Sequence, residues 1–234
     1  TIGQIYNLGV SQRSKTRFIS GFQDDGTKVG STPTNWIARV GGDGMHCEIS
    51  NFDTTVLFGN VQYGDLQRST NNGATFTDIT VPGAPGPWAA PCHLHPRRND
   101  IMVVLYKDAR VSFDIVSGAT PAFSNITTGE TNDGSAIRFS NVNDSLVFLG
   151  WENGLFRQAN ILANPITVST MTNPNGGNRI SDIETSFNNQ NVVYCTSGNR
   201  VYKSTNRGTS WTNITSNLPD ITMHSIVLDK NSPE

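Results

Sequence analysis

The sequence predicts an all-β fold, a β-propeller of four-stranded blades, and three observations lead to that prediction. Units of about 45 residues repeat along the chain. Each unit opens with a short apolar strand, which is followed by a second strand that is apolar on both faces. Two of the units also share nearly the same polar hairpin. Four strands in a unit of about 40–50 residues are typical of a propeller blade.

The two matching hairpins cover residues 65–80 and 200–215. In each, an alternating run enters a polar turn that contains a glycine, and a second alternating run leaves it. Glycine supplies the positive φ that such turns require. The aligned residues Ser69 and Ser204 are separated by 204 − 69 = 135 residues, which is three units of 45.

Five units are predicted along the chain, at residues 4–40, 45–80, 91–127, 135–172 and 180–217. The third unit has a degenerate hairpin turn at residues 114–120, and the fourth has lost this turn. The inner strands of successive units are aligned at equivalent apolar residues, namely Ile49, Leu94, Ile137, Ile183 and Ile226.

One more inner strand is predicted at residues 223–229. An open ring of blades exposes apolar sheet faces and unpaired strand edges, which soluble monomers rarely tolerate. We therefore expect remaining segments of the same polypeptide to be the partners that complete the propeller. The alternative is that residues 223–229 close the ring by pairing with the first unit.

The composition limits the classes of partner. The formal net charge of −2 gives no electrostatic reason to expect binding to nucleic acid. The longest apolar run is too short to span a bilayer. Asn, Thr, Ser and Gly are abundant and Lys is scarce, which is common in secreted proteins. We expect an extracellular or cell-surface location.

The hairpin turns carry a family resemblance. The motifs Ser69-x-Asn71-x-Gly73-x-Thr75-Phe76 and Ser204-x-Asn206-x-Gly208-x-Ser210-Trp211 resemble the Asp-box, S-x-D-x-G-x-T-W. That motif marks the turn between strands three and four of sialidase-like, sortilin-like and xyloglucanase-like propellers (BNR repeats). Both copies have Asn where the family has Asp, and Asn can still cap the turn. We expect each Asn to do so, and each closing aromatic to be buried between sheets.

Three further stretches, Gly21–Gly26, Gly41–Gly44 and Tyr63–Thr70, look like large secreted propeller proteins of Bacteroidetes. Those proteins usually carry a C-terminal type IX sorting domain. The arginine set that sialidases use is not found here. The xyloglucanase-like resemblance implies two aspartates facing each other across a cleft, one of which would lie outside this chain.

The connections that leave strands two and four lie on one face of a propeller, and this face holds the candidate site residues. Asp24 and Asp43 lie on neighbouring connections, and paired carboxylates can serve as acid and base in glycoside hydrolysis. The alternative is that Asp24, Asp25 and Asp43 are turn formers whose carboxylates bind backbone N–H groups. A third interpretation is a calcium site at the same three aspartates. No other cofactor is predicted.

Candidate ligand-binding residues share that face, namely Tyr63, Trp88, Trp151 and Glu152. Exposed aromatic side chains over a concave polar surface commonly stack on sugars. The alternative for either Trp is that its indole fills a gap between blades.

Cys47 and Cys92 occupy equivalent places in successive inner strands, where a cysteine behaves as a small apolar residue. We expect both to be buried, reduced and free of metal. A Cys47–Cys92 disulfide and a zinc site with the nearby histidines are the alternatives.

The function that we favour from sequence is non-catalytic, a secreted or surface propeller segment that binds glycan or protein, or that serves as a scaffold. The alternative is a xyloglucanase-like glycoside hydrolase domain that uses Asp24 or Asp43. Two carboxyl groups about 5–10 Å apart across a groove would favour hydrolysis, whereas carboxylates folded onto backbone N–H groups would favour a structural role.

Overall fold

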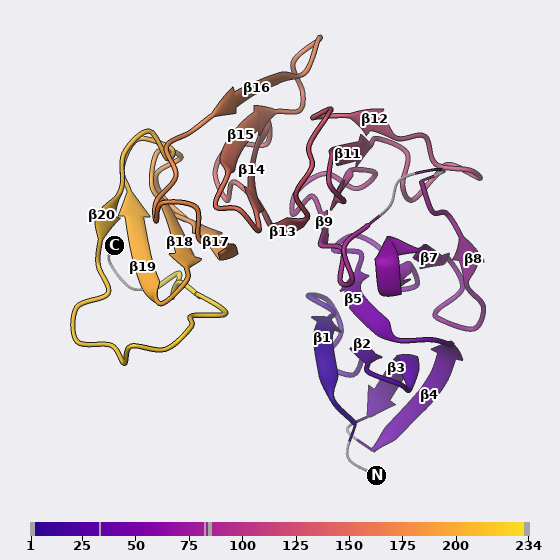
Figure 1. The fold of residues 1–234 in the computed structure, drawn as a ribbon. Coiled ribbons are helices and arrows are strands. Elements are labelled where there is room, and N and C mark those ends of the chain that lie inside the picture. Colours follow the sequence, from indigo (N-terminus) through magenta and orange to yellow (C-terminus); the bar gives the residue numbers. More distant parts are fainter. Residues whose placement is uncertain (1–2, 33, 82, 84–85, 232–234) are drawn as a thin grey trace. The chain divides into compact units, whose positions relative to one another are not determined.

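The computed structural model describes residues 3–32, 34–81, 83 and 86–231, and these residues form five four-stranded antiparallel sheets (Figure 1). In each sheet the strands lie in chain order, as in a propeller blade. The first two sheets contain β1 (Ile5–Val10), β2 (Phe18–Phe22), β3 (Gly26–Thr32) and β4 (Asn35–Val40), and then β5 (Gly44–Ile49), β6 (Leu57–Val61), β7 (Leu66–Ser69) and β8 (Thr77–Asp78).

The other three sheets follow the same order. They contain β9 (Cys92–Leu94), β10 (Met102–Leu105), β11 (Ala109–Ser112) and β12 (Ser124–Asn125), then β13 (Gly134–Phe139), β14 (Leu146–Trp151), β15 (Phe156–Asn160) and β16 (Thr167–Thr170), and finally β17 (Ile180–Thr185), β18 (Val193–Ser197), β19 (Arg200–Ser204) and β20 (Thr212–Asn213). One short 3-10 helix, η1 (Gln62–Gly64), joins β6 to β7. The strands of each sheet fall inside one of the five units predicted from sequence, except that β5 and β13 each begin one residue earlier. The predicted all-β fold of four-stranded blades is confirmed.

The strand pairing corrects the sequence alignment of the inner strands in two units. Ile49 pairs with Leu57, and Leu94 pairs with Met102, at the end of the ladder nearest the turn between strands one and two. In the fourth and fifth blades this position is taken by Phe139 and Thr185, not by Ile137 and Ile183. The predicted alignment was wrong by two residues there. An even shift keeps the same side chains on the same face, so sequence periodicity did not reveal it.

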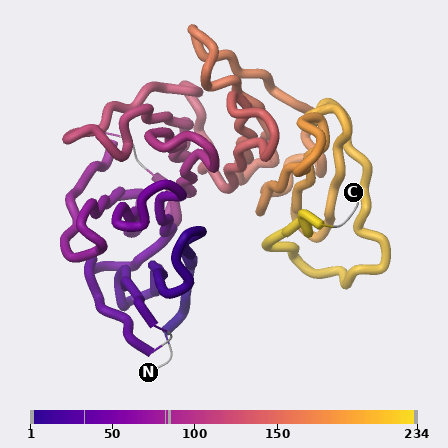
Figure 2. The backbone as a smooth tube through the Cα atoms, turned by 180° about the vertical axis from the view of Figure 1, so that it is seen from behind, coloured from indigo at the N-terminus to yellow at the C-terminus, as the bar shows by residue number. Residues whose placement is uncertain are grey.

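Residues 223–229 do not form the predicted strand. The chain leaves β20 as a long loop and returns toward β17 and β18 (Figure 2, yellow). It is held where Met223 N donates to Gly198 O at 2.9 Å and where Asp182 accepts hydrogen bonds from Ser225 and the backbone of Ile226. The described residues offer this segment no second strand, so no ladder forms.

The chain forms two compact units, one of Thr1–Tyr106 with Val111–Ser124 and one of Lys107–Arg110 with Asn125–Glu234. Apolar side chains of successive blades interdigitate within each unit. In the first unit, Cys47, Ile49 and Leu57 of the second blade pack with Ile19 and Val29 of the first blade. Because β6 is covered by neighbours on both faces, it reads as a nearly continuous apolar run, whereas His46 and Glu48 alternate with the apolar residues of β5.

The two predicted hairpin turns fold as expected from sequence. Asn206 Oδ1 accepts the backbone N–H of Ser210 at 2.9 Å, and Ser204 Oγ accepts the N–H of Gly208 at 2.8 Å. Asn71 and Ser69 make the same contacts in the second blade. The predicted caps are therefore confirmed, with Asn in the place of Asp.

The aromatic residues that close these turns are less buried than expected. Phe76 and Trp211 are both half-buried, and each packs on a core cluster that includes residues of the preceding blade. The Trp211 ring meets Phe156 edge to face with centroids 5.0 Å apart, and Trp211 Nε1 donates to Thr172 O at 2.8 Å. One edge of each ring therefore remains in solvent because the outer strands are short.

The third blade retains a longer version of this turn, where the sequence indicated a degenerate hairpin turn at residues 114–120. Ser112 Oγ donates to Asp114 Oδ1 at 2.9 Å, and that same oxygen accepts the N–H of Ala122 at 2.9 Å. The pattern matches that of Ser69 and Asn71, with extra residues between the cap and the closing N–H. Arg68 Nη1 from the preceding blade donates to carbonyl oxygens within this insertion. The turn interpreted as degenerate is therefore a lengthened form.

Removing one serine hydroxyl tests the structural role of the turns. Ser204→Ala should lower the free energy of unfolding by about 1–3 kcal/mol, because the buried N–H of Gly208 loses its acceptor. Thr205→Ala, at an exposed position of the same turn, should change stability by less than about 0.5 kcal/mol. Urea unfolding followed by circular dichroism measures both. Equal effects of the two substitutions would show that the turn is not held by Ser204.

The three cysteines are free and buried, as predicted for Cys47 and Cys92. Burial raises the pKa of each thiol, so all three are protonated at neutral pH. Among the described residues, no group of three or more His, Cys, Asp or Glu side chains could hold a metal ion.

Candidate functional site

Three exposed aromatic side chains of the first compact unit lie together, and we call Tyr6, Tyr63 and Trp88 the aromatic cluster. Trp88 contacts both tyrosines. The rings of Tyr63 and Trp88 meet edge to face, with centroids 5.3 Å apart and planes at 87°. Trp88 Nε1 donates to Tyr6 Oη at 3.3 Å, and Tyr6 Oη donates to Gln23 Oε1 at 3.4 Å. Exposed fractions of 59% for Tyr63 and 44% for Trp88 leave large ring surfaces open to a ligand.

The backbone of η1 directs Tyr63 outward. Gly64 has a φ of +84°, and its backbone lies against buried Tyr106 and Ala90, where a Cβ on Gly64 would come within 2.6 Å of the Tyr106 ring. Tyr106 Oη also donates to Gly64 O at 3.2 Å. Tyr63 consequently adopts a φ of +65°. A bulky residue in this region is an outlier, and such strain concentrates at functional sites.

The connection before β9 is fixed to the same helix. Tyr63 N donates to Trp88 O at 3.2 Å, which ties the two residues through their backbones as well as through their rings. The backbone of Gly86 passes so close to Tyr63 that a Cβ there would lie 2.3 Å from Tyr63 O. Only glycine permits that approach. The two rings are therefore held in place before any ligand arrives.

A series of hydrogen bonds joins the candidate carboxylates to Gln62, the residue before Tyr63. Asp24 N donates to Asp43 Oδ1 at 2.5 Å, and Asp43 N donates to Gln62 Oε1 at 2.9 Å. Gln62 N in turn donates to Asp43 O at 3.1 Å. The structure thus links Asp24, Asp43 and Gln62, and Tyr63 follows Gln62 in η1.

The contacts of Asp24, Asp25 and Asp43 distinguish among a catalytic, a structural and a calcium-binding role for these carboxylates. The carboxylate of Asp43 is folded onto the backbone N–H of Asp24, which is the arrangement expected for a structural role. Asp25 forms an ion pair with Lys28. The calcium hypothesis gains no support, because Asp24, Asp25 and Asp43 do not gather into a metal-binding group within the described part of the chain. Asp24 is exposed, with a φ of +58°.

Trp151 and Glu152 differ from the aromatic cluster. Trp151 is fully buried, its Nε1 donates to Lys107 O at 2.8 Å, and the guanidinium of Arg157 lies 5.7 Å from its ring. The prediction that Trp151 is exposed and stacks on a sugar is therefore wrong. Its indole is buried in the core, in keeping with the alternative interpretation. Glu152 is exposed and pairs with Arg179 at 3.0 Å.

Sequence reasoning missed the contribution of Tyr6 to the cluster. Tyr6 lies in β1, where the alternating pattern indicated an ordinary inner strand. The pairing of β1 with β2 is interrupted by an irregularity between Ile5 and Asn7, and Tyr6 lies at that point. A β-bulge re-aims a side chain without a clear sequence signal.

No protein-family model matches this chain, and no curated protein matches it. Solved structures do match. A GH74 enzyme of Niastella koreensis aligns with a TM-score of 0.69 and 14% identity, covering 89% of this chain and 38% of that one. An ancestral GH74 enzyme aligns with a TM-score of 0.74 and 14% identity, covering 93% and 32%. The GH74 xyloglucanase of Xanthomonas campestris aligns with a TM-score of 0.69 and 10% identity, covering 91% and 38%.

At these identities the likeness concerns the fold alone. It agrees with the propeller blades predicted from the repeats. The chain spans about a third of the length of each of these enzymes. Among the described residues, no helix is long and apolar enough to cross a membrane.

Proposed function

We propose that this chain is a non-catalytic propeller segment that binds an extracellular or cell-surface polysaccharide through the aromatic cluster. The observation that carries the proposal is the presence of three exposed, mutually fixed aromatic rings beside polar side chains. A sugar ring has apolar C–H faces and a polar rim, so it matches an aromatic surface flanked by hydrogen-bonding groups.

The cluster is suited to binding because its rings are already ordered. The strained backbone of Tyr63 and the hydrogen bonds of Trp88 to Tyr63 and Tyr6 keep the rings in position. Ordering side chains on binding costs about 0.5–1.5 kcal/mol for each flexible side chain, and this site avoids most of that cost. Gln23 accepts a hydrogen bond from Tyr6, Gln62 precedes Tyr63 in η1, and Asp24 follows Gln23, so these three side chains are the proposed partners for sugar hydroxyls.

A β-linked glucan such as xyloglucan is the ligand class that we propose. Support comes from the structural likeness to GH74 enzymes, one of which is a xyloglucanase, together with the exposed aromatic rings. Such a polymer is found outside cells, in keeping with the location expected from composition.

Affinity electrophoresis in gels that contain soluble xyloglucan tests this function. The wild-type chain should be retarded, and Tyr63→Ala and Trp88→Ala should each weaken binding about tenfold or more, the effect of losing a central contact of roughly 1.4 kcal/mol. Galactomannan in a parallel gel tests whether the response is specific for a glucan backbone.

Phe113→Ala is the matched control. Phe113 is exposed to the same fraction as Trp88, 44%, but lies in the lengthened turn of the third blade. The control should bind as the wild type does. Absence of retardation for the wild type, or equal losses for Trp88→Ala and Phe113→Ala, would refute the proposed site.

A hydrolase function is the second candidate, favoured by the likeness to GH74 enzymes and by the exposed carboxylate of Asp24. It requires a second carboxylate opposite Asp24. Asp43 is a poor choice for that role because its carboxylate is bound to the backbone of Asp24. The test is whether the wild-type chain releases reducing ends from xyloglucan. Release that Asp24→Asn abolishes would show that the chain is a hydrolase and not a non-catalytic binding segment.

A further inference from the structure

The first blade exposes apolar side chains at inner-strand positions that are buried in later blades. Val10 is 43% exposed and Leu8 is 50% exposed. Strand pairing assigns the same positions in the second and third blades to residues that are between 3% and 5% exposed, namely Ile49, Cys47, Leu94 and Cys92. The side chains at these positions are apolar in all three blades, so the difference in exposure comes from whether another blade packs over them.

The buried counterparts are covered by the blade that precedes them in the chain. Cys47 and Ile49 belong to one core cluster with Ile19 and Val29 of the first blade. In the other compact unit, Ile183 packs in one cluster with Phe148 and other residues of the fourth blade. Leu8 and Val10 therefore lie on the side of the first blade where a preceding blade would pack.

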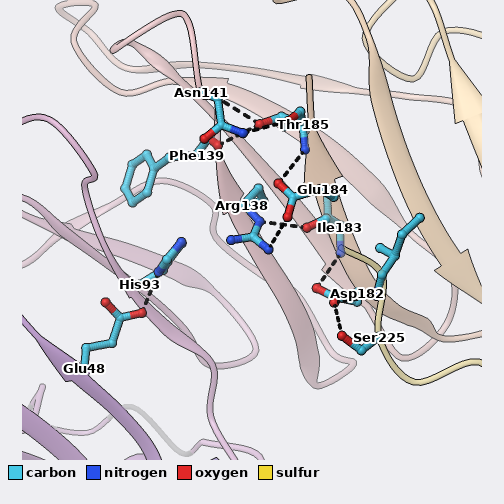
Figure 3. A network of polar contacts seen from close by, with 11 residues as sticks. Glu48, His93, Arg138, Phe139, Asn141, Asp182, Ile183, Glu184, Thr185 and Ser225 are labelled. Carbon is cyan, nitrogen blue, oxygen red and sulfur yellow. Dashed lines mark hydrogen bonds and ion pairs between the residues drawn. The ribbon is translucent and has the colours of Figure 1, made fainter. Parts of the chain in front are cut away.

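Successive inner strands also share a polar contact. A side chain of one inner strand accepts a hydrogen bond from a backbone N–H of the next, from Asn7 to Cys47 at 3.0 Å and from Glu48 to Leu94 at 3.2 Å. Asp182 does the same for the backbone N–H of Ile226 at 3.0 Å. Figure 3 shows Glu48 with its partner His93, and Asp182 with Ser225. Between the fourth and fifth inner strands the direction is reversed, because Arg138 Nε donates to Ile183 O at 2.9 Å. A covering blade is thus expected to carry a polar side chain on its inner strand, an acceptor where it meets a backbone N–H.

We propose that the face formed by Leu8 and Val10 is a docking surface for a further four-stranded blade, which the same gene product supplies from outside residues 1–234. The blade would bury the two apolar side chains and place a polar inner-strand residue against the backbone N–H of Leu8 or Val10. This is the interface that the chain already repeats between its own blades.

A second copy of this chain fits the surface less well. It would have to offer the far side of its fifth blade, where Asp182 is the residue equivalent in role to Asn7 and Glu48. That carboxylate is already engaged by Ser225 and Ile226 of its own chain, and Gly198 O accepts from Met223 N. Docking there would first have to displace residues 223–226.

Hydrogen exchange of the natural gene product compared with the 234-residue chain tests the proposal. In the gene product, the amides of β1 and β2 should exchange at least tenfold more slowly than in the 234-residue chain. The double substitution Leu8→Asp/Val10→Asp should remove that protection in the gene product and leave exchange in the shorter chain unchanged. Ile37→Asp, at a 46% exposed position of β4 in the same blade, is the matched control and should have no effect in either.

Three results would overturn the proposal. The first is equal exchange of β1 and β2 in the two proteins, which includes the case in which the gene product consists of these 234 residues alone. The second is protection in the gene product that survives the double substitution. The third is a dimer of the 234-residue chain, detected by light scattering, that the double substitution makes monomeric, because the occupant would then be a second copy.

Discussion

Replacing Trp151 by Ala should lower the free energy of unfolding by about 3–5 kcal/mol, as large truncations of fully buried aromatic residues do. The indole has no exposed surface, and it also satisfies the carbonyl of Lys107. Trp151→Phe should cost less, about 1–3 kcal/mol, because much of the packing remains. The main loss is the hydrogen bond from the indole N–H to the carbonyl of Lys107. Urea unfolding of the two variants measures the difference.

Trp88→Ala is the control for this experiment, because Trp88 is nearly half exposed. It should lower stability by about 0.5–1.5 kcal/mol at most, the contribution of its ring pair with Tyr63, while it weakens glycan binding about tenfold or more. Trp151→Ala, purified in folded form, should retain binding. The reverse outcome, a stable Trp151→Ala and a destabilised Trp88→Ala, would contradict the assignment of one indole to the core and the other to the site.

Alkaline conditions should destabilise the chain steeply, through its three buried thiols. Burial raises the pKa of Cys47, Cys92 and Cys195, so each stays protonated in the folded chain at pH values where the unfolded chain has lost that proton. Unfolding then releases protons, and stability falls as pH rises above the ordinary thiol pKa of about 8.5. The slope approaches about 1.4 kcal/mol per pH unit for each thiol, or about 4 kcal/mol for three.

The free energy of unfolding measured between pH 8 and 10 checks this prediction. The range ends at pH 10 because burial also raises the pKa of Tyr202, whose titration would add to the slope at higher pH. The variant with all three cysteines replaced by Ala is the control. It should start from a lower stability at pH 7 but lose most of the slope. An unchanged slope in that variant would show that other groups cause the alkaline loss.

The blades could be predicted from sequence because their signals are local and repeated. Runs such as Leu57–Val61 are apolar on both faces only when sheets cover both sides, and the turns at Ser69 and Ser204 repeat with the same spacing. The turn at Ser112 was recognised only as degenerate, because its insertion displaces the closing residue from the expected spacing. Residues 223–229 have the apolar pattern of a strand, but a strand also needs a partner, which no local pattern supplies.

The candidate site was predicted in part, for reasons that concern side-chain direction. Tyr63 and Trp88 were predicted because propeller geometry places the connections that carry them on one face. Trp151 ends β14, a strand that is buried at all six positions, so its ring lies in the core, whereas Tyr63 and Trp88 lie outside the strands. Tyr6 was missed because an irregularity of pairing, not a motif, turns it toward Trp88.

The most direct test of the proposed glycan-binding site is the crystal structure of this chain soaked with an oligosaccharide of the xyloglucan repeat. We predict sugar density against the rings of Tyr63 and Trp88, with hydroxyl groups within hydrogen-bonding distance of Gln23, Asp24 or Gln62. Sugar bound at another surface, or no bound sugar in crystals whose aromatic cluster is open to solvent, would contradict the account.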